Sequence, residues 1–245
     1  MIRTTKIPEY LTPALARLDE ARATHLERAC LLDDTLTAIT RITEQKAGLE
    51  QNSGSETLTW RTAFRAGGAV LTEELKQRHL EQVARRELAQ ECDNLAEVLS
   101  FECDEHKVAC NESARKFRQA HHAVLKEYAV AELEHALNDT VGALVRAMAL
   151  KITVMENPLD NTVGHQGYTE PDKAVMHEVM SFLASRVKTF TITPDNEPVL
   201  SVTGFPLREL PHMHNDAPGT PAQRKVWQEE MRTRRADLKA RGLLP

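Results

Sequence analysis

The stretch from Thr72 to Glu156 contains no proline and a single glycine, Gly142. Thr72 is a good helix N-cap, and Glu73 and Glu74 follow it in the first turn, where the helix dipole favours acidic side chains. One continuous helix of about 80 residues would span roughly 120 Å. Because a helix of that length cannot be enclosed in a compact core, we expect it to pair with another helix.

The expected partner lies between Thr12 and Glu50. Thr12 can cap this helix, Pro13 can occupy its first position, and no later proline interrupts the pattern. Its apolar residues recur at three- and four-residue steps, which predicts a helical stripe of Leu15, Leu18, Ala29, Leu32, Leu36 and Ile39. The breaks "QNSGSE" (51–56) and "AGGA" (66–69) place the turn of the hairpin near residues 51–71, with a helical segment between them. The sequence therefore predicts a short irregular lead over 1–11 and a long antiparallel coiled-coil hairpin over 12–156.

Residues 157–245 are predicted to form a smaller helical region. A helix should begin between Thr169 and Pro171 and run to about Lys188. The segment 189–219 is predicted to be loop or extended chain, and the β-branched run 189–205 fits either a small hairpin or an extended crossing. Thr220 and Pro221 repeat the cap-plus-proline start, so a last helix is expected over 220–241.

Composition agrees with an all-α fold and excludes some functions. Of the 245 residues, 41% are hydrophobic but only 4% aromatic, which favours helices over packed sheets. The net charge of −5 does not indicate a nucleic-acid partner, and no apolar run is long enough to predict a membrane span. The beginning, "MIRTTKIPEYLTPAL", lacks the apolar core of a signal peptide. We therefore expect a cytosolic protein whose four cysteines are reduced thiols.

Three cysteines and a histidine fall within twenty residues of the long helix. They lie on one helical face, with spacings of three and four residues, in a predicted seam of Leu88, Cys92, Leu95, Leu99, Cys103, His106, Cys110 and Phe117. In such a seam cysteine behaves as a small apolar residue. We therefore interpret these residues as the face that meets a partner helix.

Two alternatives for the cysteines are a zinc site and a catalytic thiol. Zinc is disfavoured because a single straight helix wraps poorly around a tetrahedral ion, and the close cysteine pairs of structural zinc sites are missing. A catalytic thiol would need a partner histidine or acid that no motif supplies. Phosphate-binding loops, HExxH and nucleophile-elbow motifs are also missing, so we expect no enzyme activity, no metal and no cofactor.

The last helix is basic although the chain is acidic. It holds seven basic and three acidic residues, and Trp227 and Met231 share one face. A basic amphipathic helix suits docking on an acidic protein surface, or RNA binding as an alternative. It could also cover the protein's own core through Trp227. Arginine and aromatic side chains dominate interface energies, so the candidate partner contacts are Arg224, Trp227, Arg232, Arg234 and Arg235.

An ordered series of segments resembles one family. The stretches "RKFRQAHHAVLKEYAVAELEHALNDTVGALVRAMAL" (115–150), "GYTE" (167–170), "FLASRVKTFTITPDNEPVLSVTGF" (182–205) and "TPAQ" (220–223) are similar, in order and spacing, to the polarity suppression protein (Psu) family of phage satellites. The resemblance covers residues 115–245. In the N-terminal half it is architectural only, and this chain is longer, with the excess in both arms of the hairpin.

The resemblance implies an all-helical fold in which two chains interlock into an elongated homodimer. It implies a non-enzymatic inhibitor that binds the bacterial transcription termination factor Rho, and a protein that decorates a satellite capsid. It therefore implies Rho and a capsid protein as partners, and the host cytoplasm and the outside of the capsid as locations. The main alternative is a purely structural capsid decoration protein that does not bind Rho. An RNA-binding adaptor is a further alternative, for which affinity should fall steeply with salt.

Overall fold

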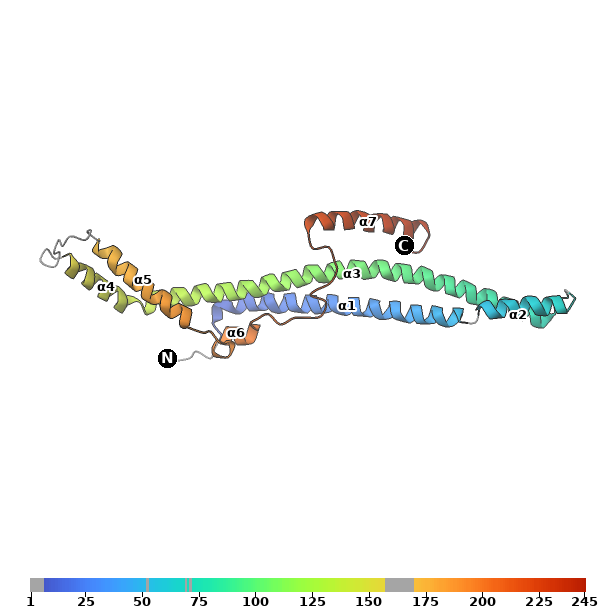
Figure 1. Cartoon of the computed structure of the whole chain (residues 1–245), viewed down its shortest axis with the longest axis horizontal. Coiled ribbons are helices and arrows are strands. Elements are labelled where there is room, and N and C mark those ends of the chain that lie inside the picture. The colour runs from blue at the N-terminus through green and yellow to red at the C-terminus, as the bar shows by residue number, and fades with distance from the viewer. Residues whose placement is uncertain (1–6, 52, 69, 71, 157–169) are drawn as a thin grey trace. The chain divides into compact units, whose positions relative to one another are not determined.

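Helices account for nearly all of the regular structure in residues 7–51, 53–68, 70, 72–156 and 170–245, which the computed structural model describes (Figure 1). No strand is present in these ranges. The elements are the 3-10 turn η1 (Glu9–Leu11), α1 (Thr12–Glu50), α2 (Ser53–Ala66), α3 (Glu73–Asp139), α4 (Gly142–Met155), α5 (Pro171–Thr189), η2 (Pro194–Asn196), α6 (Pro198–Thr203) and α7 (Pro221–Ala240). The all-α prediction is confirmed.

The chain divides into two units. The first comprises Met1–Asp19 and Arg118–Arg208, and the second comprises Glu20–Phe117 and Glu209–Pro245. Helices α1 and α3 each contribute to both units, because each of these helices crosses a boundary between the two ranges.

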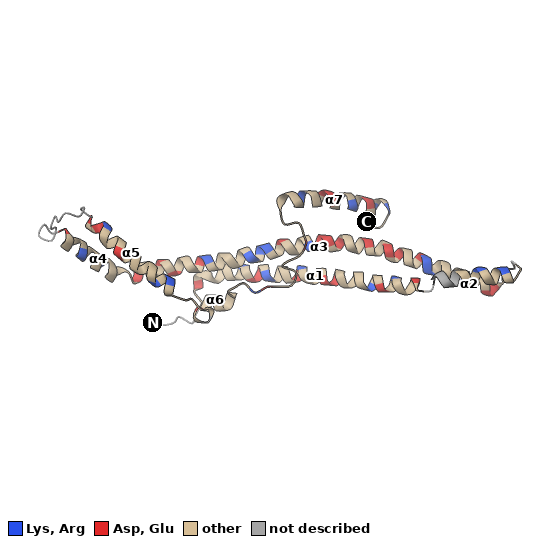
Figure 2. Cartoon of the chain, viewed as in Figure 1, with Lys and Arg blue, Asp and Glu red and all other residues tan. Residues whose placement is uncertain are grey.

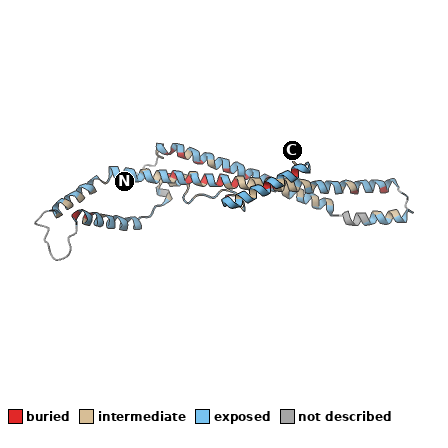
Figure 3. Cartoon of the chain, turned by 90° about the horizontal axis from the view of Figure 1, so that it is seen from above, coloured by how far each residue is buried: buried red, intermediate tan, exposed pale blue. Residues whose placement is uncertain are grey.

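Within the second unit α1 and α3 pair as an antiparallel hairpin. Leu32 of α1 packs with Cys103 and Cys110 of α3 in a buried cluster. Further along α1, the Lys46 ammonium donates to the Asp93 carboxylate at 2.7 Å. Later residues of α1 thus contact earlier residues of α3, so the two helices run antiparallel. This confirms the predicted pairing of two long helices. Figure 3 shows buried residues concentrated on these two helices.

The turn of the hairpin is closed by an aromatic cluster. Trp60 of α2 stacks on Phe64 with ring centroids 5.4 Å apart, and the His79 ring of α3 lies 5.1 Å from Trp60. The indole Nε1–H donates to the Leu75 carbonyl oxygen at 3.0 Å. Helix α2 occupies the predicted helical segment between the two breaks, and residues 52, 69 and 71 lie outside the described residues.

The first unit contains a second helix pair, α4 and α5. Lys151 of α4 donates to Glu178 of α5 at 2.5 Å, and Pro171 and Val175 are buried. The short helix α6 is anchored to α3 through Tyr128, whose hydroxyl donates to the Glu197 carboxylate at 2.7 Å. No helix among the described residues is long and apolar enough to cross a membrane.

Three local predictions need correction. The long helix is not continuous, because α3 ends at Asp139 and α4 begins at Gly142, where threonine and glycine weaken the helix. Thr12 is not a cap, because the turn Glu9–Leu11 precedes it and Thr12 itself has helical backbone angles. The prediction of loop or extended chain over 189–219 is wrong for α6, where burial of Val199 outweighs the β-propensity of its residues.

The start of the last helix was predicted correctly. Thr220 and Gln223 form a capping box, in which the Gln223 backbone N–H donates to the Thr220 hydroxyl at 3.2 Å. The Thr220 backbone N–H donates to the Gln223 side-chain oxygen at 3.1 Å, and Pro221 occupies the first turn. These contacts satisfy orphan donors at the helix N-terminus and fix where α7 begins.

Candidate interaction surfaces

Two of the three cysteines of α3, Cys103 and Cys110, are core residues. Cys103 and Cys110 are 5% and 0% exposed, and burial raises the pKa of both thiols. Cys30 on α1 is exposed, and Cys92 is half-buried. Within the described ranges no group of three or more histidine, cysteine, aspartate or glutamate side chains is placed to hold a metal ion. Cys103 and Cys110 therefore contribute to packing in the hairpin.

The other predicted seam residues are distributed unevenly. Phe117 is buried, whereas Leu99 and His106 are half-buried. Leu88 and Leu95 are 55% and 46% exposed, so the structure does not bring them onto α1. A strict seven-residue stripe on a straight helix turns away from its partner by about 20° per heptad, which accounts for the loss of contact at the far end of the seam.

Helix α7 docks on α3 through a small apolar cluster. Phe101 of α3 packs with Met231 and Leu238 of α7, and Trp227 lies at the edge of the cluster. Phe101 was not among the predicted seam residues. It lies among acidic residues on α3, and no pattern in the sequence indicates that a second helix covers it. Trp227 therefore covers the protein's own core, as one of the sequence interpretations proposed.

Arginines of α7 pair with carboxylates of α3. Figure 2 shows the basic positions of α7 and the acidic positions on the neighbouring stretch of α3. Arg234 donates to Asp104 at 2.9 Å, and Arg235 pairs with Glu105. Both guanidinium groups also lie over the Phe101 ring, at 5.8 and 5.4 Å from its centroid. With Trp227, three of the five predicted partner contacts are thus engaged against α3.

A third ion pair holds the end of α7. Arg241, which follows α7, lies 2.8 Å from the Glu97 carboxylate of α3. The hydrogen bond from Arg241 lowers the pKa of Glu97. The complementary charges of the two helices therefore extend from Asp104 to Glu97.

Of the remaining predicted contacts, Arg232 lies away from this dock, whereas Arg224 is half-buried. Arg232 is on the outer side, where it is paired only at 3.4 Å with Glu229 of the same helix and its side chain is 81% exposed. Arg224 donates to the Gly219 carbonyl oxygen at 3.1 Å. The outer side of α7 is thus the part of the predicted patch that a partner could still reach.

Helix α5 carries an exposed apolar stripe. Its members follow one another at steps of four, three, four and three residues, and each is between 42% and 74% exposed: Met176, Met180, Leu183, Val187 and Phe190. Figure 3 shows how little of α5 is buried. This spacing is typical of a coiled-coil seam, and among the described residues of the same unit no helix covers it. The spacing is visible in the sequence, but whether it faces α4 or solvent depends on the packing of the helix pair.

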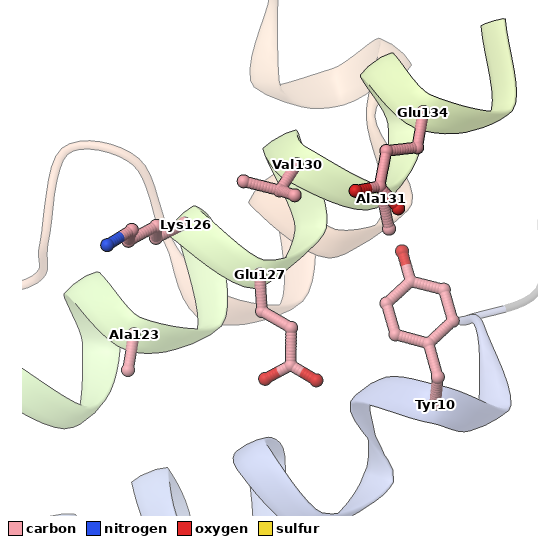
Figure 4. A pocket seen from close by; sticks show the side chains of 7 residues that line it. All are labelled: Tyr10, Ala123, Lys126, Glu127, Val130, Ala131 and Glu134. Carbon is pink, nitrogen blue, oxygen red and sulfur yellow. The ribbon is translucent and has the colours of Figure 1, made fainter. Parts of the chain in front are cut away.

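An open groove of about 430 Å³ lies beside the N-terminal turn (Figure 4). The carboxylates of Glu127 and Glu134 flank the Tyr10 ring, while the Lys126 side chain points away from it. Burial, Glu132 and Glu127 together raise the pKa of Tyr10. Alanines and Val130 complete the wall, so the lining holds no cysteine, serine or histidine.

The chain is 58% identical over 238 residues to Glycoprotein 3 of Enterobacteria phage P4, a match that covers 97% of this chain and 98% of the phage protein. It belongs to the family of phage P4 Glycoprotein 3. No protein-family model matches the chain.

A solved structure resembles this Glycoprotein 3 homologue over its whole length. It is described as the satellite phage P4 procapsid including size determination (Sid) protein. A chain in it is 57% identical, with a TM-score of 0.82, over 96% of this chain and all of the matched chain. Satellite phage and capsid, which the sequence resemblance implied, recur in these names, whereas Rho does not.

Proposed function

We propose that this Glycoprotein 3 homologue is a non-enzymatic, capsid-associated protein of a phage satellite, which acts during procapsid assembly and takes part in capsid size determination. The observation that carries the proposal is the full-length match, in sequence and in fold, to a chain of the P4 procapsid. The match extends over both units of the chain, so neither unit has been replaced by an unrelated domain.

The α5 stripe is our candidate for the assembly surface. Apolar patches that stay exposed on one chain usually mark contacts with another protein. Met, Phe and Leu side chains suit the desolvated centre of such a contact. The stripe lies on α5, whose only buried residues are Pro171 and Val175. It supports binding to a capsid protein or to a second copy of this chain, and an interlocked homodimer stays a prediction.

Two secondary proposals concern location and the last helix. Assembly with a procapsid would take place in the host cytoplasm, and a decorating protein would lie on the outside of the shell. The outer side of α7, with Arg232, is our candidate for a further contact with the capsid. A capsid decoration protein would need no active site.

Inhibition of Rho is a finer proposal that rests on the sequence resemblance alone. Neither relative's description mentions Rho. Its test is RNA-stimulated ATP hydrolysis by purified Rho, measured with and without this protein together with the size of the mixture. Suppressed hydrolysis in a stable complex would support Rho inhibition, and unchanged hydrolysis with no complex would leave capsid association as the sole function.

The main experiment is co-expression with a phage major capsid protein, followed by sedimentation and electron microscopy of the particles. We expect this protein to co-sediment with particles and to change the distribution of their diameters. Binding without a change in diameter would indicate decoration only. Particles free of this protein would contradict the proposal.

Substitutions in α5 test the assembly surface. Leu183→Lys and Val187→Lys place charges in the stripe and should abolish co-sedimentation, because an unpaired charge would be buried at the contact. Ser181→Lys is the matched control, since Ser181 is exposed on the same helix but off the stripe. Equal behaviour of the stripe variants and Ser181→Lys would assign binding to another surface.

A further inference from the structure

The segment 209–220 crosses the hairpin and leads into α7, and we call it the tether. His212 has a φ of 56°, in the left-handed region, and its Nε2 lies 2.7 Å from the Asp33 carboxylate of α1. Asn215 donates to the Lys107 carbonyl oxygen of α3 at 3.0 Å, and the Lys107 ammonium lies 3.2 Å from Asp216. The tether is therefore fastened first to α1 and then to α3.

His25 of α1 also contacts the tether, and its side chain is completely buried. Its Nε2 lies 2.8 Å from the Pro211 carbonyl oxygen of the tether, and its Nδ1 lies 3.0 Å from the Ser113 hydroxyl of α3. A carbonyl oxygen can only accept, so Nε2 carries a proton and donates it. The Ser113 hydroxyl, which faces Nδ1, also lies 3.0 Å from the Cys110 carbonyl oxygen within α3. One imidazole thus joins α1, α3 and the tether away from water.

The contacts of α7 itself are of a weaker kind. The three ion pairs with α3 have side chains between 32% and 52% exposed. Ion pairs at such positions contribute little and are screened by salt. Apolar contact comes from the single cluster around Phe101. The hairpin beneath is held separately, by the buried cluster of Leu32, Cys103 and Cys110.

We propose that the tether and α7 form a strap that opens from α3 while the α1–α3 hairpin stays folded, and that His25 is the pin that controls its opening. Opening uncovers Phe101 together with Glu97, Asp104 and Glu105, an acidic and apolar face that α7 covers in the closed state. The proposal is independent of capsid association. It rests on the different character of the contacts on the two sides of α3.

Amide hydrogen exchange of the full chain, followed by mass spectrometry, tests the strap. In the native protein, α7 amides should exchange faster than those of α3 residues 103–117, because α7 opens locally. Raising NaCl from about 0.1 to 1 M shortens the screening length from about 10 to 3 Å and should accelerate α7 alone. Equal exchange rates of the two segments at both salt concentrations would overturn the proposal.

Variants of His25 and Ser113 distinguish opening of the strap from a general loss of stability of the α1–α3 hairpin. His25→Leu removes the donor to Pro211 and should speed α7 exchange about tenfold or more, with α3 unchanged. His25→Gln, which can again donate to Pro211, should restore most of the protection. Ser113→Ala is the control, because it removes the hydroxyl that faces Nδ1 and the Cys110 carbonyl oxygen but leaves the bond between His25 and Pro211 intact.

Two outcomes at these positions would contradict a pin. One is that Ser113→Ala opens α7 as much as His25→Leu does. The other is that His25→Leu accelerates α3 and α7 equally, which would make His25 a residue of the hairpin core. If His25→Leu does not fold, the salt dependence of the native protein and the His25→Gln variant still decide between a strap and a single cooperative unit.

Discussion

Arg234 of α7 donates a hydrogen bond to the Asp104 carboxylate of α3 across 2.9 Å, although 130 positions separate the two residues in the sequence. Arg235 repeats the relationship with Glu105. The basic character of the last helix is therefore directed partly inward, toward an acidic stretch of the same chain. A partner would have to use the outer side of α7 or displace the helix.

The Arg234–Asp104 pair should contribute modestly to stability. Both side chains are about one-third exposed, so a double-mutant cycle of Arg234→Ala and Asp104→Ala should give a coupling of about 0.5–1 kcal/mol. The coupling is measured from the free energy of unfolding in urea, and should decrease in 1 M salt. The matched control is the exposed pair Arg232 and Glu229, whose coupling should be near zero. Equal coupling in both pairs would contradict the assigned role of burial.

Leu32 should be a principal support of the hairpin, because it is 1% exposed and packs with Cys103 and Cys110. Leu32→Ala should lower the free energy of unfolding by about 2–4 kcal/mol, through lost burial and the cavity left behind. Leu36→Ala, on the same helix but 39% exposed, should cost less than about 1 kcal/mol. Urea denaturation measures both, and a reversed order would show that α1 presents a different face to α3.

Alkaline pH should weaken the fold through the buried thiols. Burial raises the pKa of Cys103 and Cys110 in the folded chain. In the unfolded chain the thiol pKa is about 8.5, so above that pH the unfolded chain releases protons that the folded chain keeps. The unfolded state then binds fewer protons, and the free energy of unfolding falls as pH rises above that value. This contribution is fully present at lower pH.

The corresponding experiment is urea denaturation from about pH 7 to 10. The double variant Cys103→Ala/Cys110→Ala should show a flatter dependence on pH, while Cys30→Ala should match the native protein because Cys30 is exposed. An unchanged slope in the double variant would assign the alkaline loss to other groups, such as the tyrosines.

Tyr128 links α3 to the start of α6, and its removal should be felt in the first unit. Tyr128→Phe leaves the Glu197 carboxylate without its 2.7 Å donor and should cost about 1–2 kcal/mol. Burial and the bond to Glu197 raise the pKa of Tyr128, so a spectrophotometric titration of the native protein should include a phenol that ionises late. That component should be missing in Tyr128→Phe, and its persistence would contradict the contact.

Sequence patterns specified the helices more completely than the faces they use. The cap at Thr220, the proline after it and the pairing of two long helices could all be predicted, because capping and helical periodicity are local. The break before Gly142 was missed, since a threonine and a glycine weaken a helix without forbidding it. The helix over 198–203 was missed because burial of Val199, a tertiary effect, decides it.

The buried and exposed faces of the helices show most clearly what the sequence cannot predict. Cys103 and Cys110 could be placed in a core from their spacing, but the same spacing included Leu88 and Leu95, which remain exposed. The stripe on α5 has equally good spacing and is not covered within its unit. Periodicity identifies a face that can be buried. It does not say whether another helix of the same chain reaches that face.

The sequence by itself determined that this protein is helical, where most of its helices begin and end, and that its cysteines do not form a metal motif. Only the tertiary structure decided that α7 lies on α3, that His25 joins three segments, and that the α5 stripe is left open. The physical reason is that capping and helix propensity act over a few residues, whereas burial and ion pairing depend on groups such as Arg234 and Asp104, which only the folded chain brings together.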